Sequence, residues 1–124
     1  NWHFRSATNR TPRFWDYIAN QIKLLRVVNM CIKVSADSIA CVYNRICSLL
    51  YTGLYCAVEE KTYSQTLDKF LQIKDLKAVL ADAPVQGEHR FVVRNYVSER
   101  YRCIRWYFIV RNRIRNAVRK IKKR

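Results

Sequence analysis

The chain has 124 residues, in which 24 Lys and Arg stand against nine Asp and Glu and give a formal net charge of +15. Half of the residues are hydrophobic, which excludes a disordered basic tail and is enough for one domain with its own core. Only two Gly and two Pro interrupt the sequence. We therefore expect an all-α fold, a bundle of four long helices, rather than a sheet with many turns.

The chain begins with a short basic segment. Residues 1–11 carry Arg5 and Arg10 and no acid, and they are predicted to form an extended basic arm. Two interpretations are open: the arm lies on nucleic acid, or the segment follows a cleaved organelle transit peptide. A single helical domain is expected to cover residues 12–124.

The first helix of this domain is predicted over residues 12–34. Thr11 can cap the free amides, and the ring of Pro12 is preset for the first helical position. Apolar residues then recur at intervals of three and four, which is the helical period. They are Ile18, Ile22, Leu25, Val28 and Ile32.

The second helix is predicted over residues 36–58, with Ser35 as its cap. Between residues 38 and 58 the only charged residue is Arg45, so a transmembrane helix over 38–58 is an alternative. A central Arg is costly in hydrocarbon. The pattern therefore favours a core helix with Arg45 at the surface or paired, and Gly53 is a candidate for interrupting it.

The third helix is predicted over residues 63–83. Thr62 and Gln65 have the spacing of a capping box at its start, and Pro84 should end it. Residues 85–89 are expected to form the loop that leads to the last helix.

Most of the charge lies in residues 89–124, which hold thirteen Lys and Arg and one acid, Glu99. A single helix over 90–124 would be about 50 Å long at 1.5 Å per residue, so its last turns should project from the domain. Its apolar stripe, expected to dock on the domain, comprises Val97, Ile104, Phe108 and Ile114. The candidate nucleic-acid-binding residues are Arg94, Arg102, Arg105, Arg113, Arg115, Arg119, Lys120, Lys122, Lys123 and Arg124, with Arg5 and Arg10 of the arm.

The chemistry of these cations favours RNA as the polyanion. Arg outnumbers Lys fifteen to nine, and a guanidinium can hold a phosphate in two places. No helix-turn-helix, zinc-finger or basic-zipper pattern is present, which favours RNA over DNA. Trp106 and Tyr107 either stack on an unpaired base or pack in the core. An anionic membrane surface is a rival partner, because aromatic residues beside Arg are typical of interfacial helices.

Catalysis, a metal and a cofactor are not expected. His3 and His89 lack metal-ligand spacing, and two Gly cannot supply a phosphate-binding loop. The five cysteines form no CxxC pair, which favours free thiols that act as small core residues in a reducing compartment. One or two disulfides are the alternative. The cysteines are Cys31, Cys41, Cys47, Cys56 and Cys103.

These features predict a non-catalytic structural component of a large ribonucleoprotein, such as an organellar (mitochondrial) ribosome. It would contact RNA, first of all rRNA, and neighbouring proteins, in the mitochondrion or another reducing intracellular compartment. The alternative is an accessory structural subunit of a mitochondrial inner-membrane complex, with residues 38–58 in the membrane. A secreted, cytokine-like helical bundle is a third class.

Overall fold

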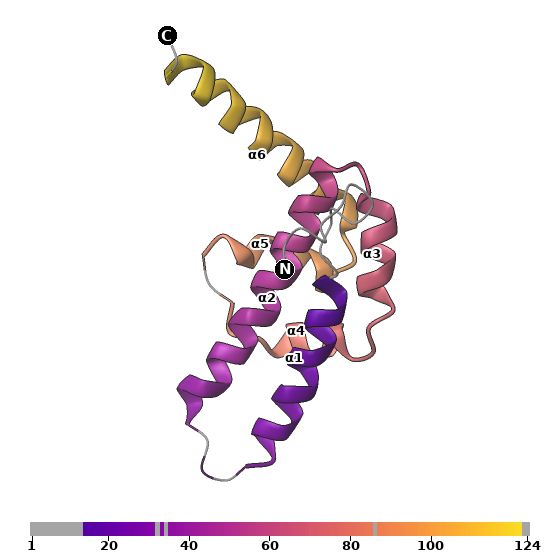
Figure 1. Cartoon of the computed structure of the whole chain (residues 1–124), viewed down its shortest axis with the longest axis vertical. Helices are drawn as coiled ribbons and strands as arrows, with labels where there is room; N and C mark the ends of the chain where they lie inside the picture. Colours follow the sequence, from indigo (N-terminus) through magenta and orange to yellow (C-terminus); the bar gives the residue numbers. More distant parts are fainter. Residues whose placement is uncertain (1–13, 32, 34, 86, 123–124) are drawn as a thin grey trace, which may run out of the picture.

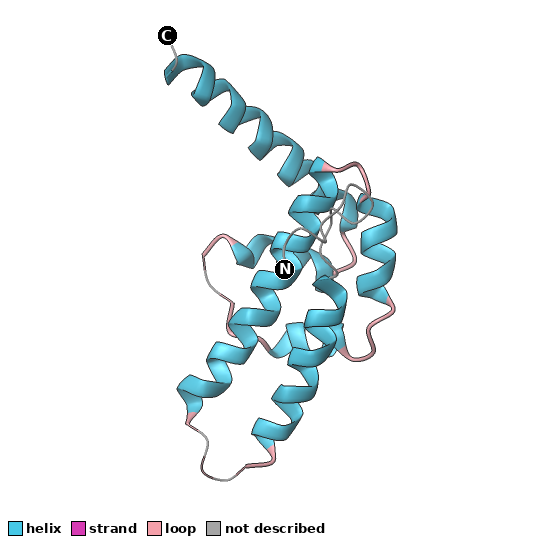
Figure 2. Ribbon diagram, viewed as in Figure 1, coloured by secondary structure: helices cyan, strands magenta, loops and turns pink. Residues whose placement is uncertain are grey.

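The computed structural model describes residues 14–31, 33, 35–85 and 87–122. These residues form six helices and no strand (Figures 1 and 2), which confirms the all-α prediction. The predicted arm over 1–11, with Arg5 and Arg10, lies outside the described residues. The helices are α1 (Phe14–Asn29), α2 (Ala36–Glu59), α3 (Tyr63–Leu71), α4 (Leu76–Asp82), α5 (His89–Val97) and α6 (Tyr101–Lys122).

Helices α1 and α2 lie side by side and run in opposite directions (Figure 1). The predicted cap of α2 is confirmed, since the Ser35 side chain accepts a hydrogen bond from the backbone N–H of Ser38 at 3.2 Å. The first helix ends at Asn29, earlier than the predicted residue 34. Met30, which follows it, is 82% exposed, so no packing supports a longer helix there.

Helix α2 is the centre of the fold and packs against α1, α3, α5 and α6. Leu50 and Leu54 are fully buried, whereas Arg45 is exposed at the surface, as predicted. Gly53 does not interrupt the helix. It lies buried where the ring of Phe70 from α3 approaches the α2 backbone. In the part of the chain that the structure describes, we find no helix with the length and hydrophobicity needed to cross a membrane.

The single helix predicted over 63–83 is wrong, because the segment forms α3 and α4 with a break between them. At the break, Asp75 adopts a left-handed conformation with φ of 69°, and its carboxylate pairs with Arg26 of α1. The capping box is also wrong: Thr62 is at the N-cap position, but its side chain makes no capping hydrogen bond. Helix α4 ends at Asp82, close to Pro84 as expected.

The single helix predicted over 90–124 is also wrong, because it is divided into α5 and α6. At the corner between them Glu99 is left-handed with φ of 62°, and the Arg100 N–H donates to the Asn95 carbonyl at 2.8 Å. This is the closure by which many helices end. Lys77 donates to Glu99 at 2.9 Å, and the nearby Tyr101 and Glu99 side chains raise the pKa of Lys77. The corner is therefore tied to α4, and the fold has six helices among the described residues instead of the predicted four.

Only the beginning of α6 is packed on the domain. Ile104 and Phe108 are fully buried, and the Tyr63 hydroxyl donates to the Tyr101 carbonyl at 2.7 Å. Arg111 and Arg115 then contact Tyr51 and Tyr55 of α2, and the last turns of α6 extend away from the other described helices (Figure 1).

The five cysteines are free thiols, but the prediction that they mostly fill the core is wrong. Cys47 is buried and Cys56 is half-buried, whereas Cys31, Cys41 and Cys103 are exposed. Cys41 and Cys103 lie on exposed faces of α2 and α6, and Cys31 follows the end of α1.

The difference in burial predicts a difference in thiol reactivity. A brief alkylation of the native protein at pH 8, followed by mass spectrometry, should modify Cys31, Cys41 and Cys103 well before Cys47. Burial raises the pKa of the Cys47 thiol from 9.0 to about 11, so the reactive thiolate is scarce there. Because the unfolded chain ionises Cys47 at lower pH, this group lowers the free energy of unfolding as the pH rises from 9.0 towards about 11. Equal alkylation rates at Cys47 and Cys41 would contradict the burial.

Candidate nucleic-acid interface

Most of the predicted nucleic-acid-binding residues lie together on α6. Arg102, Arg105, Arg113 and Arg115 are exposed there, as are the three cations of its last turns. Those three are Arg119, Lys120 and Lys122. Arg94 is exposed but lies on α5, on the other side of the Glu99 corner. Lys123 and Arg124 fall outside the described residues.

Helix α6 has little internal charge compensation. It contains no Asp or Glu, and within the described residues one ion pair involves an α6 cation, that of Arg111 with Glu88 at 3.2 Å. Arg111 also lies over the ring of Tyr51 at 5.6 Å, and Arg115 lies over Tyr55 at 5.4 Å. These two side chains are held against the domain, whereas the other α6 cations point into solvent. Such a surface attracts polyanions.

The predicted docking stripe is only partly correct. Ile104 and Phe108 are buried and Val97 is half-buried, but Ile114 is 60% exposed. Phe108 packs against Tyr51 and Tyr55, with ring centroids 5.1 and 5.6 Å away. The stripe therefore docks through the first two turns of α6. Beyond them Arg111 and Arg115 face α2, and Ile114 lies on another face of the helix.

A second apolar row on α6 was not predicted. Its residues recur at helical spacing and include Trp106, which is 61% exposed, so core packing does not account for this side chain. The row runs through Cys103, Trp106, Val110, Ile114 and Ile121. Tyr107 beside it stacks on Phe91 of α5, with ring centroids 5.0 Å apart. The spacing was visible in the sequence, but a single stripe was assumed for the whole helix.

This row forms one side of a groove of about 640 Å³ between α5 and α6. The groove is lined by Phe91, Cys103, Trp106, Tyr107, Val110, Arg111 and Ile114. Arg111 is its one charged residue, and the rest of the lining is apolar or aromatic.

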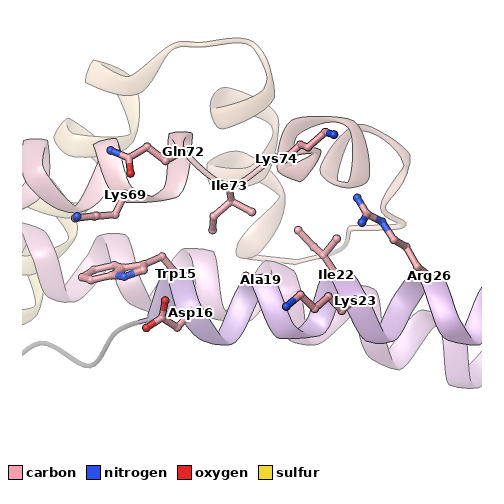
Figure 3. A pocket seen from close by; sticks show the side chains of 10 residues that line it. All are labelled: Trp15, Asp16, Ala19, Ile22, Lys23, Arg26, Lys69, Gln72, Ile73 and Lys74. Carbon is pink, nitrogen blue, oxygen red and sulfur yellow. The ribbon is translucent and has the colours of Figure 1, made fainter.

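A second hollow lies between α1 and the end of α3 (Figure 3). Trp15 and Ile22 on α1 face Ile73 across a space of about 490 Å³. Lys69 and Lys74 line it, but Figure 3 shows their amino groups at opposite ends of the hollow. Arg26, which also lines the hollow, is paired with Asp75. The hollow therefore concentrates less positive charge than α6, whose surface is the stronger candidate.

Glu88 and His89, next to the groove, contact other side chains of the domain. Glu88 pairs with Arg111, and the His89 ring lies 4.9 Å from that of Tyr51. Within the described ranges, His, Cys, Asp and Glu side chains form no group of three that could hold a metal ion. Comparison with protein families, characterised proteins and solved structures found no match to this chain.

Proposed function

We propose that the chain is a non-catalytic structural component of a large ribonucleoprotein, such as a mitochondrial ribosome, in which α6 contacts RNA. One observation carries the proposal: the 22 residues of α6 include eight Lys and Arg, all exposed, and no acid. In this proposal the domain is a helical bundle from which a long basic helix reaches the RNA.

The physical argument is one of charge and reach. Concentrated positive charge opposes the compact state through self-repulsion, and a polyanion alongside the helix relieves this cost. At about 1.5 Å per residue, α6 is about 33 Å long and can follow several successive phosphates. Its cations lack the arrangement of a helix-turn-helix or zinc finger, which supports RNA recognised by shape and backbone rather than DNA read by sequence.

Two further features support an assembly in a reducing compartment. The exposed Cys31, Cys41 and Cys103 are unpaired, as suits the mitochondrial matrix or another reducing intracellular space. The exposed apolar row of α6 supports a neighbouring protein in addition to RNA, because large apolar rows are seldom left in water.

The proposal predicts that three cations of α6 supply most of the salt-dependent affinity. Replacing Arg105, Arg113 and Arg119 with Gln should weaken binding to a structured rRNA fragment by about tenfold or more near 0.15 M salt. The slope of the logarithm of the binding constant against the logarithm of the salt concentration should become less negative by about 2. Each lost phosphate contact reduces the magnitude of this slope by about 0.7 to 0.9. Fluorescence anisotropy with labelled RNA measures both the affinity and the salt slope. The titrations cover about 0.05 to 0.3 M salt, the range over which such affinities change most.

A matched variant removes three positive charges elsewhere. Lys23, Lys69 and Lys74 line the hollow between α1 and α3, and their replacement with Gln changes the net charge equally. This variant should retain most of the RNA affinity and the original salt slope. If both triple variants lost the same affinity, the binding would reflect net charge alone and the proposal for α6 would be wrong.

A further inference from the structure

The groove between α5 and α6 is a surface feature that RNA binding does not account for. Apart from Arg111 its lining is apolar or aromatic, and Trp106, Val110 and Ile114 stand exposed along it. Phosphates do not pair with such side chains. The row follows the helix axis at intervals of three and four residues, so an occupant that complements it has apolar side chains at the same intervals. An amphipathic helix has this pattern.

The charge beside the groove determines the second property of its occupant. By helical spacing, Arg102 and Arg113 lie along one side of the row. Lys122 lies along the other side, as does Arg111, which is already paired with Glu88. No acid of α6 offsets them. An occupant with Asp and Glu beside its apolar row would pair with both flanks, and rim charges of opposite sign raise specificity and association rate.

We propose that this groove binds an acidic amphipathic helix of a partner protein. The inference rests on the proposed function in one respect, that the chain works within an assembly that contains other proteins. Charge excludes a second copy of this chain, because it would bring two sets of α6 cations together. It also excludes the chain's own residues 1–13, which carry three Arg and no acid. Phe91 on α5 gives the groove a second side, which an inserted helix can contact more fully than a flat bilayer surface can.

Synthetic helices test the proposal directly. One peptide of about 20 residues, long enough to follow most of α6, carries Leu at intervals of three and four with flanking Glu. A second has Lys in place of each Glu. The Glu peptide should bind the full chain in a fluorescence anisotropy titration, and the Lys peptide should bind at least about tenfold more weakly, as expected for like charges in contact.

Native cysteines report the location of binding. Cys103 lines the groove, whereas Cys41 is exposed on α2. The bound Glu peptide should slow alkylation of Cys103 and leave that of Cys41 unchanged. If Cys103 stayed fully reactive in the bound state, the peptide would lie elsewhere and the proposal would be wrong.

A pair of double variants separates the groove from general hydrophobicity without changing charge. Val110 and Ile114 are 48% and 60% exposed, and Leu24 and Val27 on α1 are 39% and 59% exposed. Replacing Val110 and Ile114 with Ser should weaken binding of the Glu peptide by about tenfold or more, because each replacement removes apolar area that is buried on binding. The same replacement of Leu24 and Val27 should have little effect.

Three outcomes would each overturn the proposal. The first is no binding of the Glu peptide while vesicles containing phosphatidylserine protect Cys103, which would indicate a membrane surface. The second is that RNA protects Cys103 from alkylation and that replacing Val110 and Ile114 removes this protection, which would mean that RNA occupies the groove. The third is protection that appears with protein concentration alone, which would indicate self-association. If the Val110 and Ile114 variant loses the Glu peptide but still binds RNA, the result tests the groove alone and leaves the proposed RNA-binding function unaffected.

Discussion

Replacement of Gly53 with Val is expected to lower the free energy of unfolding by about 3 kcal/mol or more and to unfold much of the protein near body temperature. A Cβ added to Gly53 would lie 2.6 Å from Cζ and 3.1 Å from Cε2 of Phe70. It would also lie 3.1 Å from Cβ of Phe14. Phe70 is fully buried, so its ring has no space into which it can move. The helices α1 and α3 would have to separate from α2.

Replacement of Gly53 with Ala is a more specific test of the contact between Gly53 and Phe70. Ala is favoured over Gly inside a helix by about 1 kcal/mol, so a destabilised Gly53→Ala variant can only reflect the clash. Urea denaturation monitored by circular dichroism gives the free energy of unfolding of both variants. Ala117 on the exposed side of α6 is a suitable control, since Ala117→Val adds a branched side chain without a neighbour and should cost well under 1 kcal/mol. A rise in stability for Gly53→Ala would contradict the packing.

Replacement of Phe108 with Ala is expected to cost about 3 to 5 kcal/mol and to release α6 from the domain. Phe108 is fully buried, and its ring joins α6 to Tyr51 and Tyr55 of α2. Without it, Ile104 is the only fully buried side chain that attaches this helix among the described residues.

Hydrogen exchange distinguishes release of α6 from general unfolding. In Phe108→Ala, amides of residues 101–108 should exchange faster than those of the α1 and α2 core, at a denaturant concentration where the domain remains folded. Val118→Ala on the exposed part of α6 should leave stability within about 0.5 kcal/mol. Uniformly faster exchange across all helices would mean that α6 is not a separate unit.

The sequence predicted those elements whose boundaries depend on nearby residues. The α2 helix and its Ser35 cap follow from local hydrogen bonding and an apolar period, and the structure has both. The break at Asp75 could not be predicted in this way, because its partner Arg26 is 49 residues away. The break at Glu99 was missed for a related reason: left-handed residues are usually Gly or Asn, and no such residue marks the corner.

The candidate site was predictable in its charge but not in its shape. Exposure of the α6 cations could be inferred from their number and spacing. Helical spacing places Ile114 on a different face of α6 from Phe108. The docked face continues instead through Arg111 and Arg115, which lie over Tyr51 and Tyr55 of α2, and this use of cations is a tertiary property. Local periodicity finds an apolar residue but does not say whether a neighbour covers it.

Because α6 starts at the Glu99 corner and projects beyond the domain, a small rotation near the corner moves the far end of the helix by a large distance. From residue 109 to residue 122, a span of about 21 Å at 1.5 Å per residue, the helix contacts the described core through the side chains of Arg111 and Arg115, and residues 116–122 are all exposed. A rotation of about 15° at the docked end would move the far tip by about 5 Å, close to one helical turn. The hydrogen bond between Lys77 and Glu99 involves no residue of α6, but it helps to set the direction of this helix and therefore the positions of its Arg and Lys side chains. Loss of this hydrogen bond would change which phosphates the tip can reach while leaving every binding side chain in place.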